Sequence, residues 1–221
     1  SMAAYLDAKL RLFRDVIVDG GTAVVWADDE YSSAVVGAAR DRGLNVMTVG
    51  LAGDGLQLLS REPSQLGQTL TIEAEGKTHK VVLPLIGAYQ SANALVSAGL
   101  VIATGADVAQ TIGNLARVQG VRGRLERAVI TKTGAPVYVD YAHTPDALVA
   151  ACEAVRPHAK GRIILMFGAG GDRDTGKRPE MGAAAMANAD YVIVTDDNPR
   201  SEDPASIRSA ILASAPGARD I

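Results

Sequence analysis

The sequence has few of the features that mark secreted, membrane-embedded or nucleic-acid-binding proteins. Its only cysteine is Cys152, which excludes an internal disulfide and fits a reducing compartment. No apolar run reaches the ~18 residues of a membrane-spanning helix, and we expect no signal peptide ahead of Tyr5. The net charge of −3 gives no reason to expect nucleic acid as a partner.

Aromatic residues are also scarce, at 4%, although hydrophobic residues as a whole make up 48% of the chain. A sizeable core must therefore be packed mainly by alanine, glycine and valine. This mix suits an α/β fold, in which small residues let helices approach sheets closely. The 221 residues suffice for one large domain or two ordinary ones.

The hydrophobic pattern predicts two α/β domains with a boundary near Gly120. Residues 22–50 have the pattern of a strand, a helix and a strand, which indicates parallel pairing. Residues 70–85 alternate and turn at Glu75-Gly76-Lys77, which predicts an antiparallel hairpin. Two helices should follow this hairpin, with Asp107 capping the second. After Gly120 the alternation of strands and helices restarts.

Both ends of the sequence look cut. It opens inside a predicted helix, residues 2–17, with no cap before it. It ends at residues 216–221, on what resembles the approach to another strand. We therefore expect a fragment with domains at residues 1–120 and 121–221, the second incomplete.

Polar clusters follow three strands that we expect to lie parallel in the second domain. They are VDYAH (139–143), FGAGGDRD (167–174) and VTDDNPR (194–200). In open α/β sheets, ligands bind outside the carboxyl ends of the strands. The three clusters together predict a binding edge. The alternative is ordinary turn chemistry, since Asp, Asn and Gly all favour turns.

The residue types in these clusters suggest a ligand that carries both charges. Arg173 could hold a carboxylate through two parallel hydrogen bonds, and Asp197 could accept from an ammonium group. An amino acid would satisfy both. Asp140 could bind a ribose hydroxyl. His143 could act as a base or contact a phosphate, although a histidine in such a loop can also be purely structural.

Five stretches, in order, resemble the Mur ligase family. They are YLDAKLRLF, VRGRLE, VDYAHTPDAL, FGAGGDRDTGKRPEMG and DDNPRSEDP, and they spread over nearly the whole chain. The resemblance implies the later part of a central, P-loop-type ATP-binding domain followed by a Rossmann-like C-terminal domain. It also implies a peptide-bond-forming ligase that uses ATP and passes through an acyl phosphate.

The resemblance assigns catalytic and nucleotide-binding roles to particular residues. Lys9 matches a lysine that the family carbamylates, and a carbamate could hold Mg²⁺. Carbon dioxide reacts with a neutral amine, which a desolvated lysine provides most readily. Arg124 and Asp140 match contacts to the ATP phosphates and ribose, and Asn93 matches a contact near the base or phosphates. His143 joins Lys9 and Arg124 as a candidate catalytic residue and also contacts the nucleotide.

The amino-acid pocket implied by the resemblance contains Arg173, Asp197, Asn198 and Arg200. The order DNPR, with arginine last, is similar to members that add meso-diaminopimelate to UDP-N-acetylmuramoyl-L-alanyl-D-glutamate in peptidoglycan synthesis. Diaminopimelate has a second carboxylate that lysine lacks, and an arginine can pair with it. The alternatives are a related ligase that adds L-lysine or another amino acid, and a non-catalytic amino-acid-binding paralogue. Folylpolyglutamate synthetases share the scaffold more distantly.

Several stretches of the family pattern are missing from this sequence. They are the phosphate loop GxxGKT, an acid and a histidine that help to bind magnesium, and a closing GKGHE-like stretch. Gln90 also stands where many members have asparagine. We therefore expect the intact protein to be a cytoplasmic, monomeric ligase, and the fragment by itself to be inactive.

Overall fold

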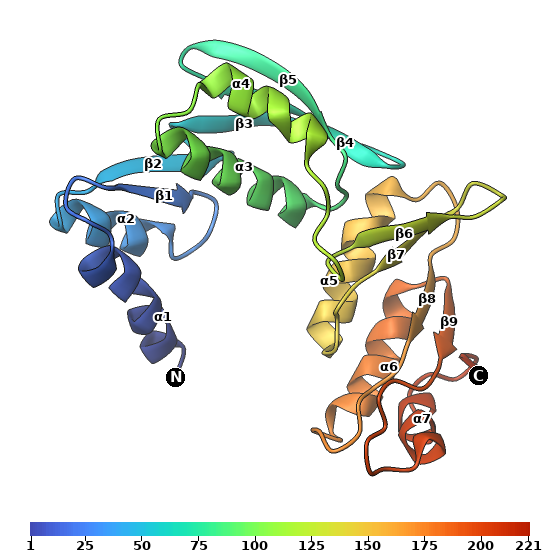
Figure 1. Cartoon of the computed structure of the whole chain (residues 1–221). Coiled ribbons are helices and arrows are strands. Elements are labelled where there is room, and N and C mark those ends of the chain that lie inside the picture. The colour runs from blue at the N-terminus through green and yellow to red at the C-terminus, as the bar shows by residue number, and fades with distance from the viewer. The chain divides into compact units, whose positions relative to one another are not determined.

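The computed structural model describes all 221 residues, which form two compact units at residues 1–119 and 120–221 (Figure 1). Both units contain sheets covered by helices, as expected of an α/β protein. None of the helices combines the length and the apolar character that a membrane span would need.

Unit 1 contains a five-stranded mixed sheet in which the strands follow chain order. These strands are β1 (Thr22–Trp26), β2 (Asn45–Gly50), β3 (Leu56–Ser64), β4 (Gly67–Ala74) and β5 (Lys77–Leu83). The pairs β1–β2 and β2–β3 are parallel, and β3–β4 and β4–β5 are antiparallel. The predicted parallel start and later antiparallel hairpin are therefore both confirmed.

The turn between β4 and β5 has the geometry that its sequence predicts. Glu75 and Gly76 have φ values of 51° and 69°, and Ala74 pairs directly with Lys77 across the two-residue loop. Two successive residues with positive φ match the right-handed twist of a hairpin, and glycine adopts this conformation at little cost.

Helices pack on both faces of the unit 1 sheet. The helical segments are α1 (Met2–Arg11), the π-helical η1 (Leu12–Val16), α2 (Ser32–Asp41), α3 (Ala88–Ala103), α4 (Val108–Asn114) and η2 (Leu115–Arg117). Ala23 and Val25 of β1 share a core with α2 and η1, whereas Val24 packs against the core that contains α3. Alternate residues of a strand point to opposite faces, so one short strand serves both layers.

Capping of these helices follows the sequence with one exception. Asp107 caps α4 by accepting from Gln110 N at 2.8 Å, as predicted. The first helix was expected to lack a cap, but Ser1 Oγ accepts from Ala4 N at 3.4 Å. Serine is a common N-cap residue because its hydroxyl can reach a free amide of the first turn.

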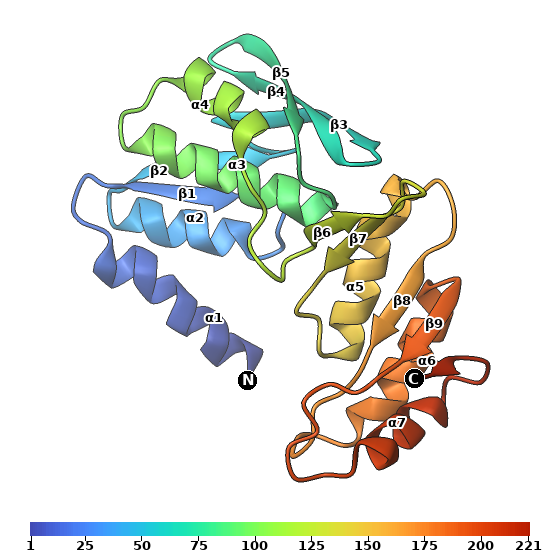
Figure 2. The same ribbon diagram turned by 45° about the vertical axis from the view of Figure 1, so that its right-hand side comes forward.

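Unit 2 contains a three-stranded parallel sheet in the order β10-β9-β8. Its strands are β8 (Ile164–Phe167), β9 (Tyr191–Val194) and β10 (Arg219–Asp220). Between them run α6 (Lys177–Asn188) and α7 (Pro204–Leu212), as Figure 2 shows. Together with α5 (Pro145–Val155), these helices bury one face of the sheet, which includes Phe167 and Val194.

One predicted strand of unit 2 has a different partner from the one expected. Residues 136–139 form β7 (Pro136–Val139), which pairs antiparallel with β6 (Glu126–Ile130) in a separate two-stranded sheet. The expectation that this strand lies parallel to β8 and β9 is therefore wrong. The sequence pattern had not indicated β6, which lies only five residues upstream and can pair through a short turn.

Two helices of unit 2 begin with capping residues that are common at this position. Thr144 accepts from Ala147 N at 3.3 Å at the start of α5, and Asp203 accepts from Ser206 N at 3.0 Å at the start of α7. Pro145 and Pro204 occupy the first helical positions. Proline is favoured there because the amide that it lacks would have no helical partner.

The packing of α6 against α7 yields a stability prediction at Gly182. A Cβ added at this position would overlap the carbonyl oxygen of Ile211, which is backbone and cannot move away easily. We expect Gly182→Ala to lower the free energy of unfolding of unit 2 by ~1–3 kcal/mol, measured by urea denaturation.

Gly37 provides the matched control for this substitution. It lies inside α2, and a Cβ added there would have nothing within 4 Å. Gly37→Ala should therefore stabilise unit 1 by ~0.5–1 kcal/mol through helix propensity. If both variants raised stability, the close approach of α6 and α7 would be contradicted.

Candidate functional site

Two loops leave the same edge of the unit 2 sheet. Parallel pairing aligns the last residues of β8 and β9, Phe167 and Val194, and Thr195 N extends the ladder by donating to Phe167 O at 3.0 Å. The loops that follow, residues 168–176 and 195–203, therefore start side by side. Carboxyl ends of parallel strands are the usual ligand-binding edge of such sheets.

The two loops touch through their backbones at Gly171. Its amide donates to Asn198 O at 3.1 Å, and a Cβ added at this position would overlap the carbonyl oxygen of Pro199. A side chain at position 171 would thus push the loops apart. The glycine-rich sequence is required here for close approach, whatever else it binds.

Three non-glycine residues in these loops adopt the left-handed backbone conformation. Asp172, Asn198 and Arg200 have φ values of 52°, 44° and 53°. Such conformations are strained for side chains larger than Asn or Asp and persist where the surrounding contacts hold them. Arg200 is held by a hydrogen bond from its Nη1 to Gly171 O at 3.2 Å.

The structure brings together the four residues predicted to contact an amino acid. Arg173 lies in the 168–176 loop, and Asp197, Asn198 and Arg200 lie in the 195–203 loop. All four are exposed. These four side chains present two guanidinium groups, one carboxylate and one amide to solvent within two adjoining loops.

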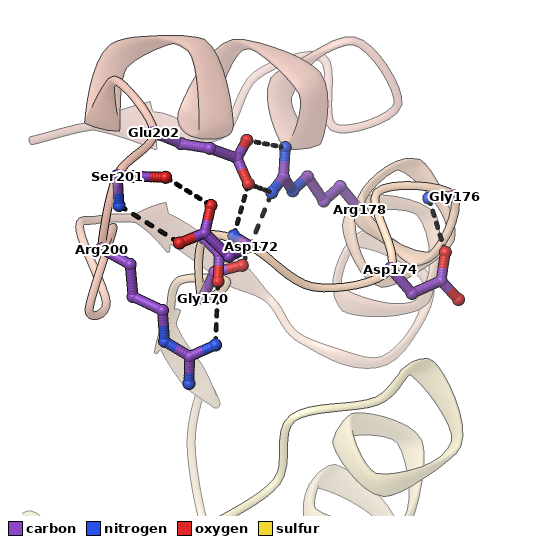
Figure 3. Close-up of polar contacts among 9 residues, drawn as sticks. Gly170, Asp172, Asp174, Gly176, Arg178, Arg200, Ser201 and Glu202 are labelled. Carbon is purple, nitrogen blue, oxygen red and sulfur yellow. Dashed lines mark hydrogen bonds and ion pairs between the residues drawn. The ribbon is translucent and has the colours of Figure 1, made fainter.

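A polar network behind these residues was missed by the sequence analysis (Figure 3). Arg178 of α6 is only 4% exposed, and its Nη1 and Nη2 donate to the two carboxylate oxygens of Glu202 at 2.9 and 2.8 Å. Glu202 Oε1 also accepts from Asp172 N at 2.6 Å. The Asp172 carboxylate in turn accepts from Ser201 Oγ at 2.6 Å and from Ser201 N at 3.3 Å.

The charges of this network are set by the ion pair at its centre. Hydrogen bonds from Arg178, together with the Asp172 amide, hold the pKa of Glu202 below its usual value. The hydrogen bond to Glu202 raises the pKa of Arg178 against the opposing effect of its burial. Both groups are therefore charged at neutral pH. Nothing local in the sequence marked Arg178 for burial, because it stands between Lys177 and Pro179-Glu180 at the start of a helix.

A second group of predicted residues surrounds Asp140, which follows β7. The two Asp140 oxygens accept from Leu125 N and Ala142 N, each at 2.9 Å, and so join the segment after Gly123 to the start of the 140–144 turn. Arg124 and His143 are both exposed. Both also lie against Tyr141, with the guanidinium 5.4 Å and the imidazole centroid 5.2 Å from the ring centroid.

A lysine at the start of α6 links this group to the two loops. Lys177 Nζ donates to the carbonyl oxygen of His143 at 2.9 Å. The backbone of the 140–144 turn is thereby tied to the helix that follows the 168–176 loop. The candidate site residues of unit 2 thus fall into two groups, one around Asp140 and one on the two loops, and Lys177 ties the first group to the helix that follows the 168–176 loop.

The other two candidates, Lys9 and Asn93, belong to unit 1. Asn93 lies on α3, and its Nδ2 is 3.4 Å from Gln90 Oε1. Lys9 is exposed on α1, with Nζ 5.3 Å from the centroid of the Tyr5 ring. Lys9 directly precedes Leu10, the only buried residue of α1.

Two family descriptions match the sequence. Residues 1–101 match the Mur ligase middle domain, and residues 123–220 match the Mur ligase, glutamate ligase domain. A UDP-N-acetylmuramoyl-L-alanyl-D-glutamate–2,6-diaminopimelate ligase from Caulobacter vibrioides is 55% identical over 221 residues. The enzyme of the same name from Zymomonas mobilis is 54% identical over 221 residues. All of this chain aligns with 46% of either protein, so it spans about half the length of the curated relatives it matches.

Solved structures show the same relationship. A diaminopimelate ligase structure of the same name superposes with a TM-score of 0.70 at 30% identity, covering 100% of this chain and 46% of that one. A folylpolyglutamate synthase from Thermotoga maritima superposes with a TM-score of 0.77 at 19% identity, covering 99% and 51%. The second likeness concerns the fold alone.

The lowered pKa of Glu202 predicts a loss of stability in acid. A carboxyl whose folded pKa lies below its ordinary value of 4.5 stabilises the fold fully above that pH. This contribution is lost as the pH falls from about 4.5 through the lowered pKa. We expect Glu202→Gln to flatten the acid side of the stability curve of unit 2, measured by urea unfolding between pH 7 and pH 3.

Other carboxylates set the baseline for this measurement. Hydrogen bonds from Ile163 N and from Arg156 lower the pKa of Asp190, and hydrogen bonds from Ser206 lower that of Asp203, so some acid sensitivity should remain in the variant. If the free energy of unfolding fell by the same amount between pH 7 and pH 3 in the wild type and in Glu202→Gln, the prediction would be contradicted.

Proposed function

Because this chain belongs to the Mur ligase family, we propose that it forms part of an ATP-dependent ligase. The ligase would add meso-diaminopimelate to UDP-N-acetylmuramoyl-L-alanyl-D-glutamate through an acyl phosphate, in peptidoglycan synthesis. The observation that carries the proposal is the gathering of Arg173, Asp197, Asn198 and Arg200 on two adjoining loops. Identity of 54–55% to relatives of that activity, along the whole chain, supports it.

The charges of the two loops suit the ends of diaminopimelate. This amino acid carries two carboxylates and two ammonium groups, so it needs at least two cationic contacts and an anionic one. Arg173 and Arg200 would each pair with a carboxylate, and Asp197 would accept from an ammonium group. The Asn198 amide can both donate and accept, and it would fix the orientation of either end.

The group around Asp140 would bind the nucleotide. An ionised carboxylate can accept about four hydrogen bonds, and backbone amides occupy two positions on Asp140, so its oxygens can still accept from ribose hydroxyls. The exposed guanidinium of Arg124 would face the phosphates, and His143 would contact them or act as a base. Asn93 of unit 1 would lie near the base or phosphates.

Magnesium fits this chain less well than the nucleotide does. No group of three or more His, Cys, Asp and Glu side chains is placed to hold a metal ion, and Lys9 is exposed. Lys9 remains a proposed site of carbamylation, which would give it an anionic oxygen. We also propose that the protein works in the cytoplasm as a monomer.

Arg200 provides the sharpest test of the amino acid. In the ligase that contains this chain, Arg200→Ala should raise KM for meso-diaminopimelate by about 10–100-fold, the effect of losing one charge-assisted contact. L-lysine lacks the second carboxylate, so its use should change by less than about threefold. Initial rates of ADP release with ATP, Mg²⁺ and the UDP-linked dipeptide would measure both.

Arg219→Ala is a control of the same residue type in the same unit, exposed and outside the two loops. It should leave both KM values unchanged. Equal losses with diaminopimelate and lysine in Arg200→Ala would contradict the assignment to diaminopimelate. Binding of diaminopimelate without any ADP release by the wild type would instead favour the non-catalytic alternative.

A further inference from the structure

The Arg178–Glu202 pair lies beside the proposed amino-acid pocket but takes no part in it. Arg178 is buried, with 5% of its side chain exposed, and Glu202 is 29% exposed. The guanidinium donates to the Glu202 carboxylate through Nη1 and Nη2, and Nη2 also lies 3.5 Å from the Gly170 carbonyl oxygen. Figure 3 shows these contacts of Arg178 with Glu202 and with the loop backbone at Gly170.

A buried ion pair is a weak source of stability. Removing two charges from water costs several kcal/mol per ion, and apolar residues of the same size often stabilise a protein as well or better. Arg178 Nε is also buried without a hydrogen-bond partner, which adds to this cost. A charge pair that contributes little net stability is best explained by the geometry that it imposes.

The ion pair holds in place the two loops that carry the pocket residues. Arg178 sits on α6, yet Glu202 belongs to the 195–203 loop, so the pair joins the helix to that loop. Glu202 also accepts from Asp172 N, which joins the 195–203 loop to the 168–176 loop. Asp172 and Arg200 both have left-handed backbones, which need such contacts to persist.

The pocket residues are the immediate neighbours of these contacts. Arg173 follows Asp172, and Arg200 precedes Ser201, whose Oγ and N both donate to the Asp172 carboxylate. Fixing Asp172 and Ser201 therefore fixes where the Arg173 and Arg200 side chains begin. Displacement of a binding group by about 1 Å can cost up to ~100-fold in a reaction that depends on orientation.

We propose that Arg178 and Glu202 are positioning residues for the amino-acid pocket. Their ion pair holds the 168–176 and 195–203 loops together before the substrate arrives, so Arg173 and Arg200 meet its carboxylates at the correct spacing. This inference rests on the proposed function for the identity of the substrate. It does not require either residue to touch the substrate.

The experiment replaces Arg178 by lysine, which keeps the positive charge but loses the planar fork that binds both Glu202 oxygens. In the ligase that contains this chain, Arg178→Lys should raise KM for meso-diaminopimelate by about tenfold or more. KM for ATP and for the UDP-linked dipeptide should stay within about twofold, since none of the residues proposed to bind the nucleotide lies in these loops. All assays are run well below the Tm of every variant.

Arg156→Lys is the matched control. Arg156 pairs with Asp190 at 2.7 Å in the same unit, but Asp190 precedes β9 and binds Ile163 N, which precedes β8. This pair therefore lies at the amino edge of the sheet, opposite the two loops. Arg156→Lys should lower Tm without changing KM for any substrate.

Glu202→Gln tests the other half of the pair. It should raise KM for diaminopimelate as Arg178→Lys does, and the double variant should be no worse than the more affected single variant, because both changes remove one interaction. Additive effects of the two changes would contradict a shared role. A uniform rise of all three KM values, or a fall in Tm alone, would overturn the inference in favour of a merely structural pair.

Hydrogen exchange separates this inference from the proposed function. In this chain, Arg178→Lys should speed exchange of the Gly171 and Asp172 amides by about tenfold or more, whereas Arg156→Lys should not, because both amides are bonded across the loops. If the wild type failed to use diaminopimelate, the proposed function would fall and this measurement would still decide the positioning role. Unchanged exchange at both amides would overturn it.

Discussion

Parallel pairing of β8 with β9 is the constraint on which the candidate site depends. It aligns Phe167 with Val194, so the two loops that follow these residues begin side by side at one edge of the sheet. Gly171 then allows their backbones to touch, because it has no Cβ to meet Pro199. Residues that are far apart in the sequence, such as Gly171 and Asn198, thereby become neighbours.

Charge in these loops is divided between two layers with different tasks. The outer layer, which includes Arg173, Asp197 and Arg200, is exposed and available to a ligand. In the inner layer, both Nη atoms of Arg178 bind Glu202, and the pair contacts the loop backbone at Gly170 and Asp172. The two tasks suit different side chains. A guanidinium whose two Nη atoms are already bound to a carboxylate has little capacity left to bind a ligand. An exposed side chain without supporting contacts is not held accurately enough to bind one with precision.

The fold and the substrate are specified at different levels. A folylpolyglutamate synthase shares the fold with a TM-score of 0.77 at only 19% identity, so the scaffold accepts very different sequences. What distinguishes this chain from such neighbours must lie in the side chains that the strand ends present. At that finer level, this chain is 54–55% identical over its full length to two diaminopimelate ligases.

The sequence by itself determined the features that depend on neighbouring residues. The hairpin turn at Glu75-Gly76, the cap at Asp107 and the polar residues after β8 and β9 all follow from local backbone preferences. Only the tertiary structure decided that β7 pairs with β6 and that Arg178 meets Glu202, 24 positions away. Strand partners, buried ion pairs and exposure depend on which distant segments meet in space, and local preferences do not encode that choice.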